Sequence, residues 1–258
     1  MQLPAGAFAE DDVVRTANPG GAHTIVLICE HASSRIPPEF HDLGLEADAL
    51  TSHIAWDPGA METALALSGR LGAALVYSTV SRLVYDCNRP PEASGAMPAK
   101  SEIYTVPGNA DLTEADRRLR TDIYYRPFEQ RIEEVLNERG DDAVIVTLHS
   151  FTPVYNGVQR DVEIGVLHDA DSRFADAMLE MAEGYDIRRN EPYGPGDGVT
   201  HTLKRHALPR GINNVMIEIR NDLIATPEQC LAMAAYLARW LEAALATPRQ
   251  PQLGETAK

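Results

Sequence analysis

The chain of 258 residues is long enough for a large core, and its 44% hydrophobic and 24% charged residues are typical of globular proteins. Its formal net charge of −15 argues against a nucleic-acid surface, because phosphate binding needs clustered lysine and arginine, but it does not exclude a small anionic substrate. No stretch reaches the ~18 consecutive apolar residues of a membrane span.

The cysteines and the N-terminus indicate where the protein resides, and the sequence as a whole predicts one catalytic domain. The cysteines Cys29, Cys87 and Cys230 form no CxxC pair, which is typical of reduced core thiols. Residues 1–12 contain acidic residues and no lysine or arginine, unlike a secretory signal, so we expect a cytoplasmic protein. We expect residues 1–246 to form the domain, with 1–22 as an irregular lead-in, and residues 247–258 to be a disordered tail.

Strands alternate with helices along the first half of the chain. A strand is predicted over residues 24–30. A helix follows, with Asp57 as its N-cap, Pro58 as its first residue and Gly72 at its end. A strand over 74–79 and a strand-like run at 83–85 come next. Residues 91–111 are predicted as a long loop, of the kind that often serves as a lid.

The same alternation continues to the C-terminus. A long helix over 113–140 is expected to bend or break at Pro127. Further strands are predicted over 143–150, 162–168 and 214–220, a helix over 172–184, a loop over 190–199, and a last helix from the capping signal at Thr226. This order predicts an α/β fold, a mixed sheet with helices on both faces.

Three of these strands end in residues that suit metal chemistry. Glu30 and His31 end the first, His149 and Ser150 end the strand over 143–150, and Glu218 lies in the strand over 214–220. In α/β sheets, ligands bind beyond the carboxyl ends of the strands, so these residues are expected to share a site. Two histidines and a carboxylate are the usual protein ligands of a catalytic zinc ion.

The third metal ligand is open at this point. His31 and His149 are the candidate imidazoles, although a single histidine at such a position is more often a hydrogen-bonded core residue. The carboxylate could be Asp57, Glu30 or Asp86. His53 lies four residues before Asp57 and is a further candidate, while Asp57 could equally be a plain helix cap.

Glu218 is the candidate general base. Its neighbours in sequence are apolar, so burying it would be costly unless it had a function or a partner. The alternative is a salt bridge, for which the candidate partners are Arg82, Arg205 and Arg220.

Arginines would give the site a preference for carboxylates. Arg82, Arg89 and Arg220 could each bind a carboxylate through two hydrogen bonds, and an arginine near the scissile carbonyl would stabilise an oxyanion. Surface ion pairs are the alternative reading of these arginines. His201 and His206 could bind substrate, protonate a leaving amine or simply belong to a loop.

Five short segments, in this order, resemble the N-formylglutamate amidohydrolase family. They are Cys-Glu-His-Ala-Ser at 29–33, Ser-Arg-Leu-Val-Tyr-Asp-Cys-Asn-Arg-Pro at 81–90, Leu-His-Ser at 148–150, Glu-Ile-Gly at 163–165 and Ile-Glu-Ile-Arg at 217–220. The resemblance covers residues 24–245. It implies a phosphorylase/hydrolase-like fold, similar to that of the zinc carboxypeptidases and of the aspartoacylase and succinylglutamate desuccinylase group.

The resemblance also implies roles for individual residues. His31 and His149 match the two zinc-binding histidines, Glu218 the catalytic base, and Arg82 with Asn88 and Arg89 the substrate-binding segment. Carboxypeptidase-like enzymes have a glutamate ligand three residues after the first histidine. This chain has Ser34 there, so we select Asp57 as the third ligand.

The expected activity is zinc-dependent hydrolysis of an acidic N-acyl amino acid, most simply N-formyl-L-glutamate to formate and L-glutamate. Besides Asn88 and Arg89, we expect Arg220, Ser150 and His201 to contact the substrate, and Arg82 to stabilise the oxyanion. The alternatives are a deacylase of another N-acyl or N-carbamoyl amino acid, a carboxypeptidase-like peptidase, and a metal-free carboxylate-binding protein of the same fold.

Overall fold

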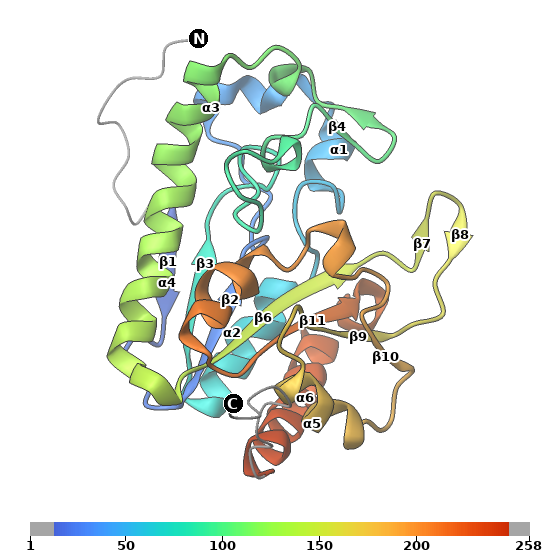
Figure 1. Ribbon diagram of the computed structural model, residues 1–258. Coiled ribbons are helices and arrows are strands. Elements are labelled where there is room, and N and C mark those ends of the chain that lie inside the picture. The colour runs from blue at the N-terminus through green and yellow to red at the C-terminus, as the bar shows by residue number, and fades with distance from the viewer. Residues whose placement is uncertain (1–12, 248–258) are drawn as a thin grey trace, which may run out of the picture.

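A seven-stranded sheet forms the centre of the molecule (Figure 1), with the strand order β1-β3-β2-β6-β11-β9-β10. The computed structural model describes residues 13–247. Strands β3, β2, β6 and β11 are parallel to their neighbours in this series, whereas β1 and β9 pair antiparallel with β3 and β11. The seven strands are β1 (Val14–Ala17), β2 (Ile25–Cys29), β3 (Ala74–Ser78), β6 (Val144–Phe151), β9 (Ile164–Leu167), β10 (Ile187–Arg189) and β11 (Asn214–Arg220).

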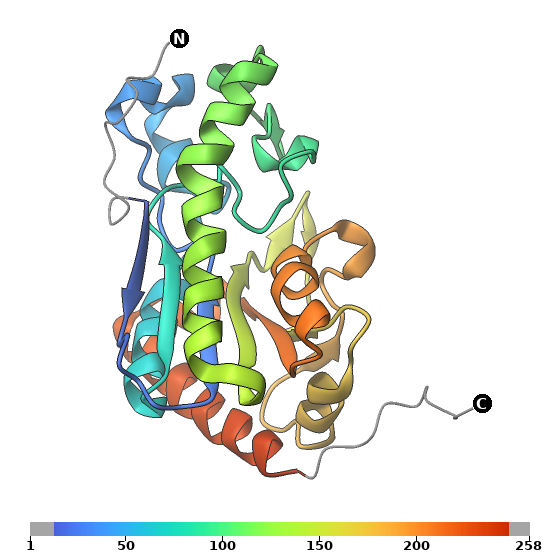
Figure 2. The same ribbon diagram turned by 60° about the vertical axis from the view of Figure 1, so that its left-hand side comes forward.

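Helices cover both faces of this sheet (Figure 2). Helices α2 (Ala60–Leu71), α5 (Arg173–Glu180) and α6 (Pro227–Ala246) pack on one face, and α4 (Arg126–Arg139) packs on the other. Consecutive residues of β2 belong to opposite cores, because side chains alternate along a strand: Leu27 packs with α2 and α6, and Ile28 with α4. This explains the unbroken apolar runs in the sequence and confirms the predicted single-domain mixed α/β fold.

The predicted break at Pro127 takes the form of a π-helix. Thr113 caps helix α3 (Glu114–Arg120) by a capping box with Asp116, and a five-residue π-helix (Thr121–Tyr125) joins α3 to α4. Pro127 lies in the first turn of α4, directly after the π-helix.

The remaining elements are short. Helix α1 spans Ala47–Thr51, and two hairpins are formed by β4 (Lys100–Ser101) with β5 (Tyr104–Thr105) and by β7 (Val154–Tyr155) with β8 (Val158–Gln159). Segments of 3₁₀-helix span Pro38–Gly44, Ser94–Ala96, Pro107–Asn109, Gly140–Asp142, Pro195–Asp197, Leu208–Arg210 and Asn221–Ile224, and a second π-helix spans Leu203–Ala207. Among the described helices, none has the length and apolar character that a membrane crossing would need.

Three sequence predictions are corrected by the fold. Part of the lead-in predicted as irregular is the edge strand β1, in which only Val14 is buried, too short a pattern to be recognised. Residues 1–12 of that lead-in and 248–258 of the predicted tail lie outside the described residues. Residues 83–85, predicted as strand-like, are buried in a turn, because the Ser81 hydroxyl ties the chain to the Ala55 carbonyl.

The third correction concerns the start of α2. The helix begins at Ala60 rather than after Asp57, and its N-cap is Gly59 in the left-handed region, with φ of 78°. A Cβ atom at Gly59 would lie 2.2 Å from the carbonyl oxygen of Ile224, so only glycine fits this turn. Asp57 is therefore not the helix cap, and its carboxylate is available for other contacts.

Candidate active site

Four candidate residues from the sequence lie together at the carboxyl ends of the central strands. Strands β2, β6 and β11 are adjacent and parallel, so their carboxyl ends lie together. Glu30 and His31 directly follow β2, His149 lies near the end of β6, and Glu218 lies directly opposite His149 in the register of β11. The three strand ends thus deliver their polar residues to one place, as the sequence predicted.

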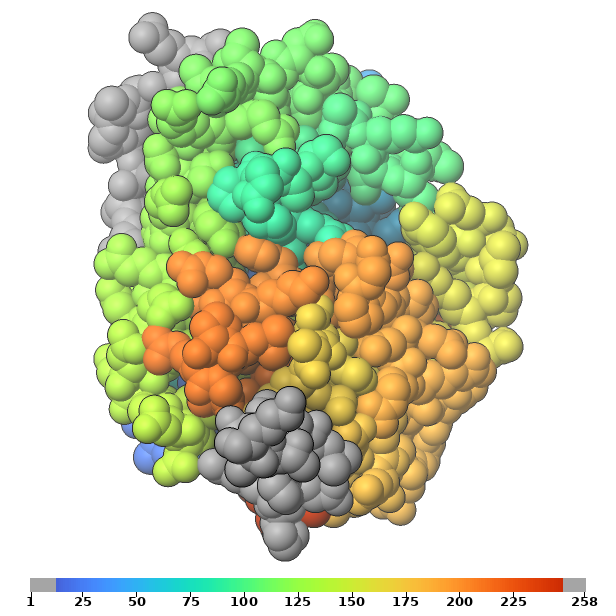
Figure 3. Space-filling view, viewed as in Figure 1, coloured from blue at the N-terminus to red at the C-terminus, as the bar shows by residue number. Residues whose placement is uncertain are grey.

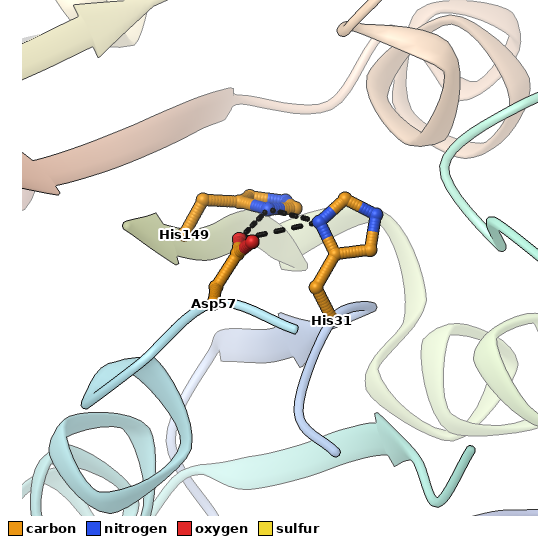
Figure 4. A group of neighbouring side chains, drawn as sticks. All are labelled: His31, Asp57 and His149. Carbon is orange, nitrogen blue, oxygen red and sulfur yellow. Dashed lines mark hydrogen bonds and ion pairs between the residues drawn. The ribbon is translucent and has the colours of Figure 1, made fainter. Parts of the chain in front are cut away.

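His31, His149 and Asp57 direct one ligand atom each toward a common point (Figure 4). The Nδ1 atoms of the two histidines lie 3.2 Å apart. Asp57 Oδ2 lies 3.2 Å from Nδ1 of His31 and 2.8 Å from Nδ1 of His149. All three residues are buried, with 1–4% of their surface exposed.

This geometry fits a zinc ion. Zinc bonds of about 2.0–2.1 Å to tetrahedral ligands place the ligand atoms about 3.3 Å from one another. The observed separations of 2.8–3.2 Å are within a few tenths of an ångström of that value. Two imidazoles and one carboxylate are also a donor set that catalytic zinc sites use, with a fourth position left for water.

Each of the two histidines has a second carboxylate on its other ring nitrogen. Asp86 Oδ1 lies 2.7 Å from Nε2 of His31, and Glu30 Oε2 lies 3.0 Å from Nε2 of His149. At His31 this hydrogen bond holds the proton on Nε2 and leaves the Nδ1 lone pair for a metal, whereas Glu30 and His149 are within ion-pair distance without the alignment of a hydrogen bond. Glu30 and Asp86, which the sequence left open as ligands, therefore lie on the far sides of the two rings.

Backbone and hydroxyl contacts hold the Asp57 segment in place. The Asp57 N–H donates to the His31 carbonyl (3.0 Å), and the Ser150 N–H donates to Asp57 Oδ2 (3.3 Å). The Ser150 hydroxyl donates to the carbonyl of Pro58 (2.8 Å). Ser150, predicted to contact substrate, lines the cavity described below, but its hydroxyl is engaged in positioning the Asp57 loop.

The electrostatics of the cluster favour a charged Asp57. Burial alone would raise the pKa of this carboxyl, but His31 and His149 more than offset burial and hold the pKa below its usual value. Burial likewise opposes the charged form of His149, but the carboxylates of Glu30 and Asp57 raise its pKa well above the usual value.

Glu218 has the opposite environment. Burial raises its pKa to about 7, the charge of His149 works against this shift, and the nearby Asp57 carboxylate adds to it. Its Oε2 atom has no hydrogen-bond partner among the described residues. The salt bridge considered as an alternative is not formed in the described chain, because Arg82, Arg205 and Arg220 pair with other carboxylates.

A cavity of about 540 Å³ opens over this cluster, a size within the usual range for small-molecule sites. Figure 3 shows the hollow between the green segment that carries β4 and β5, the yellow hairpin β7–β8 and the orange loop over 190–199. Of the residues predicted for the site, those that line the cavity are His31, Asp57, Arg82, Asn88, Arg89, His149, Ser150 and Glu218.

The segment from Arg82 to Arg89 forms one wall. Arg82 donates to Asp86 Oδ2 at 2.8 Å and to Asp57 Oδ1 at 3.4 Å, so it lies beside the three converging ligand atoms. The Asn88 side chain is fixed by Thr202, whose N–H donates to Asn88 Oδ1 at 3.0 Å. Arg89 donates to the carbonyl of Asp197 at 2.9 Å and forms no ion pair within the described chain.

Arg220 and His201 do not line the cavity. The Arg220 guanidinium turns back along the sheet edge to Asp222 (2.8 Å) and Glu163 (3.5 Å). His201 lies 2.7 Å from the hydroxyl of Tyr125, and burial lowers the pKa of this histidine to about 4. The predicted contact of Arg220 with substrate gains no support from this arrangement, because local carboxylates bind its guanidinium.

The candidate metal ligand His53 does line the cavity, but its Nε2 atom lies 2.6 Å from a carboxylate oxygen of Glu102.

Two further residues of the cavity wall could not be recognised as site residues from the sequence. Arg160 follows strand β8, and Tyr193 lies in the loop over 190–199. Both belong to turn-rich segments, where a polar residue reads as ordinary surface.

The loop that carries Tyr193 reaches the site because of Gly165 in β9. Gly165 is directly opposite Glu218 in the sheet, and a Cβ atom there would lie 2.0 Å from the carbonyl oxygen of Glu191. Only glycine lets the loop approach the sheet this closely. The Glu-Ile-Gly segment of the sequence thus shapes the wall next to Glu218.

No curated protein matches this chain. The crystal structure of gene product Atu2144 from Agrobacterium tumefaciens is 55% identical, with a TM-score of 0.89, and the match covers 92% of this chain and 96% of that one.

The crystal structure of N-formylglutamate amidohydrolase from Ralstonia eutropha JMP134 is 19% identical over 88% of this chain and 99% of that one, with a TM-score of 0.49. The family model for N-formylglutamate amidohydrolase matches residues 23–225. The chain therefore belongs to the N-formylglutamate amidohydrolase family.

Proposed function

We propose that this protein is a zinc-dependent amidohydrolase that cleaves N-formyl-L-glutamate to formate and L-glutamate. The observation that carries the proposal is the convergence of three ligand atoms, from His31, His149 and Asp57, next to the buried carboxylate of Glu218. Membership of the family supports amide hydrolysis as the reaction class. A bound zinc ion would lower the pKa of water and polarise the acyl carbonyl.

Glu218 is the proton carrier in this proposal. Its free Oε2 atom accepts a proton as the oxygen of water forms its bond to the formyl carbon. The same proton then passes to the nitrogen as the carbon–nitrogen bond breaks, which releases formate and the amine of glutamate. A pKa of about 7 suits both directions of transfer near neutral pH.

The arginines of the cavity wall bind and polarise the substrate. Arg82 lies beside the ligand atoms and donates to the carbonyl oxygen, where negative charge develops. Arg89 has no carboxylate partner among the described residues and is available for the α-carboxylate of the substrate.

Formate release tests this proposal. Purified protein is stripped with a chelator, its metal content is measured, and hydrolysis of N-formyl-L-glutamate is followed before and after zinc is restored. We expect turnover to disappear with the metal and to return with zinc. Turnover by protein shown to be free of metal would contradict the zinc requirement. Binding without turnover by the zinc-loaded protein would favour the alternative of a carboxylate-binding protein.

A further inference from the structure

Arg160 is held in the cavity wall by aromatic rings. It directly follows strand β8 of the hairpin β7–β8, which projects from the body of the molecule in Figure 1. Arg160 and Tyr155 of this hairpin line the cavity. Its guanidinium carbon lies 4.5 Å from the ring centre of Tyr155, 5.0 Å from that of Tyr193 and 5.6 Å from that of Phe151. These contacts fix the plane of the guanidinium without neutralising its charge.

The hydrogen bonds of Arg160 leave most of its donors unused. Nη1 donates to the hydroxyl of Tyr193 (3.1 Å) and to the carbonyl of Thr152 (3.4 Å). Within residues 13–247, Nη2 and Nε donate no hydrogen bond and Arg160 forms no ion pair. A partly buried arginine with free donors facing a cavity is suited to an anionic ligand.

Most of the other charged groups of the cavity have charged partners; the exceptions within the described chain are Glu218, Arg89 and Asp197, whose carboxylate accepts a hydrogen bond from the Gly194 N–H. Arg82 pairs with Asp57 and Asp86, and Glu102 pairs with His53. Arg89, like Arg160, meets no carboxylate within the described chain, and it donates to a backbone carbonyl. The cavity therefore presents two guanidinium groups without acid partners, enough for two carboxylates.

The two arginines come from different segments of the cavity wall. Arg89 belongs to the segment of the wall that also carries Asp86, which contacts His31, and its guanidinium donates to the carbonyl of Asp197. Arg160 contacts the hydroxyl of Tyr193 in the loop over 190–199. Arg160, Tyr193 and the proposed base Glu218 all line the same cavity.

We infer that Arg160 determines substrate specificity by binding the side-chain carboxylate of an acidic N-acyl amino acid, while Arg89 binds the α-carboxylate. This inference rests on the proposed function and deepens it. It makes the hairpin β7–β8 the element that distinguishes a dicarboxylate substrate from a neutral one of the same size.

The test compares N-formyl-L-glutamate with N-formyl-L-glutamine, which has the same shape and no side-chain charge. For the zinc-loaded Arg160→Gln variant, we expect kcat/KM to fall about 10- to 100-fold with formylglutamate and to change little with formylglutamine. Arg160→Lys, which keeps the charge but loses the planar fork, is expected to be intermediate. Arg118→Gln, on the exposed surface of α3, is the matched control and should resemble the wild type.

Equal losses for both substrates, or no loss for either, in a folded Arg160→Gln protein would overturn the inference. Binding supplies a second readout that needs no turnover. Calorimetric titration of the two formyl amino acids into zinc-loaded Glu218→Gln protein, with and without Arg160→Gln, should show the same selective loss. If formylglutamate binds but is not hydrolysed by the wild type, the proposed activity fails while the role of Arg160 is still decided. If neither compound binds, both fail.

Discussion

Two neighbouring carboxyl groups, Asp57 and Glu218, have opposite electrostatic environments. Burial opposes the charge of both, but the two histidines that contact Asp57 lower its pKa, whereas the pKa of Glu218 is raised to about 7. A carboxylate that stays ionised suits a metal ligand, and one that titrates near neutrality suits proton transfer. Environment alone thus separates the two proposed roles.

Glu218→Gln separates these roles by experiment. The amide keeps the shape of the side chain but cannot accept the proton, so we expect turnover to fall about 10²- to 10⁴-fold while the zinc content stays at that of the wild type. Formate release and metal analysis on the same preparation measure both effects. Glu62→Gln, on the exposed side of α2, is the control. Retained turnover in Glu218→Gln would remove this residue from the base role.

Asp86 gives a second prediction at this scale. Its contact with Nε2 of His31 orients the ring, so Asp86→Asn should weaken zinc binding about 10- to 100-fold. Competition with a chromophoric chelator measures the affinity. Glu102→Gln is the matched control, because Glu102 lines the same cavity but contacts His53. A larger loss in Glu102→Gln than in Asp86→Asn would indicate that the metal lies near His53 instead.

Among the elements, the turn into α2 decides where Asp57 lies. Both ends of this helix carry a glycine in the left-handed region, Gly59 with φ of 78° and Gly72 with φ of 64°. Only Gly59 is also in close contact, because its Cβ position lies 2.2 Å from the carbonyl oxygen of Ile224 and nothing lies within 4 Å of the Cβ position of Gly72. A side chain at Gly72 would therefore meet backbone strain alone, whereas a side chain at Gly59 would meet both backbone strain and a steric clash.

Alanine at each end of α2 tests this difference. Gly72→Ala should cost about 1–2 kcal/mol of unfolding free energy, the strain of a left-handed alanine. Gly59→Ala should cost more and should also weaken zinc binding, because the shift needed to relieve the clash moves Asp57. Urea unfolding and zinc titration measure the two effects. If both variants lost the same unfolding free energy and Gly59→Ala kept the zinc affinity of the wild type, the Gly59 turn would not position the site.

The strand ends are the part of the site that the sequence could predict. An unbroken apolar run followed by His31 or His149 indicates a buried strand with a polar end, and parallel strands bring such ends together. Which carboxylate completes the cluster could not be read from the pattern. Asp57 before Pro58 has the local signature of a helix cap, and only the contact of Gly59 with the Asn221–Ile224 segment frees it from that role.

The arginines show the limit of such prediction. The sequence predicts that Arg220 contacts substrate, but Glu163 and Asp222 lie close enough to pair with its guanidinium. Arg160 lies next to a turn-rich hairpin and gave no signal, because its role depends on rings from Phe151 and Tyr193, which only the fold brings to it.

At the scale of the whole molecule, the proposed metal site joins distant parts of the chain. His31, Asp57 and His149 come from three loops or strand ends, and His31 and His149 are 118 positions apart in sequence. A ligand that binds only the folded state stabilises it by mass action, about 2.7 kcal/mol at a concentration 100 times its Kd. Zinc binding should therefore be visible in global unfolding.

Thermal unfolding with and without zinc tests this linkage. For a domain of this size, that stabilisation corresponds to a rise in Tm of about 5–11 °C. The shift, rather than the Tm itself, is compared between the wild type and Asp57→Asn, because the variant also loses buried hydrogen bonds. A full zinc shift in Asp57→Asn would show that Asp57 does not bind the metal.

The most direct test of the central claim is the position of the metal in crystals of the zinc-loaded protein, measured by anomalous scattering at the zinc edge. The predicted result is one anomalous peak within bonding distance of His31 Nδ1, His149 Nδ1 and Asp57 Oδ2. A peak bound instead by Glu30, Asp86 or His53, or no peak in zinc-loaded protein that hydrolyses N-formyl-L-glutamate, would contradict it.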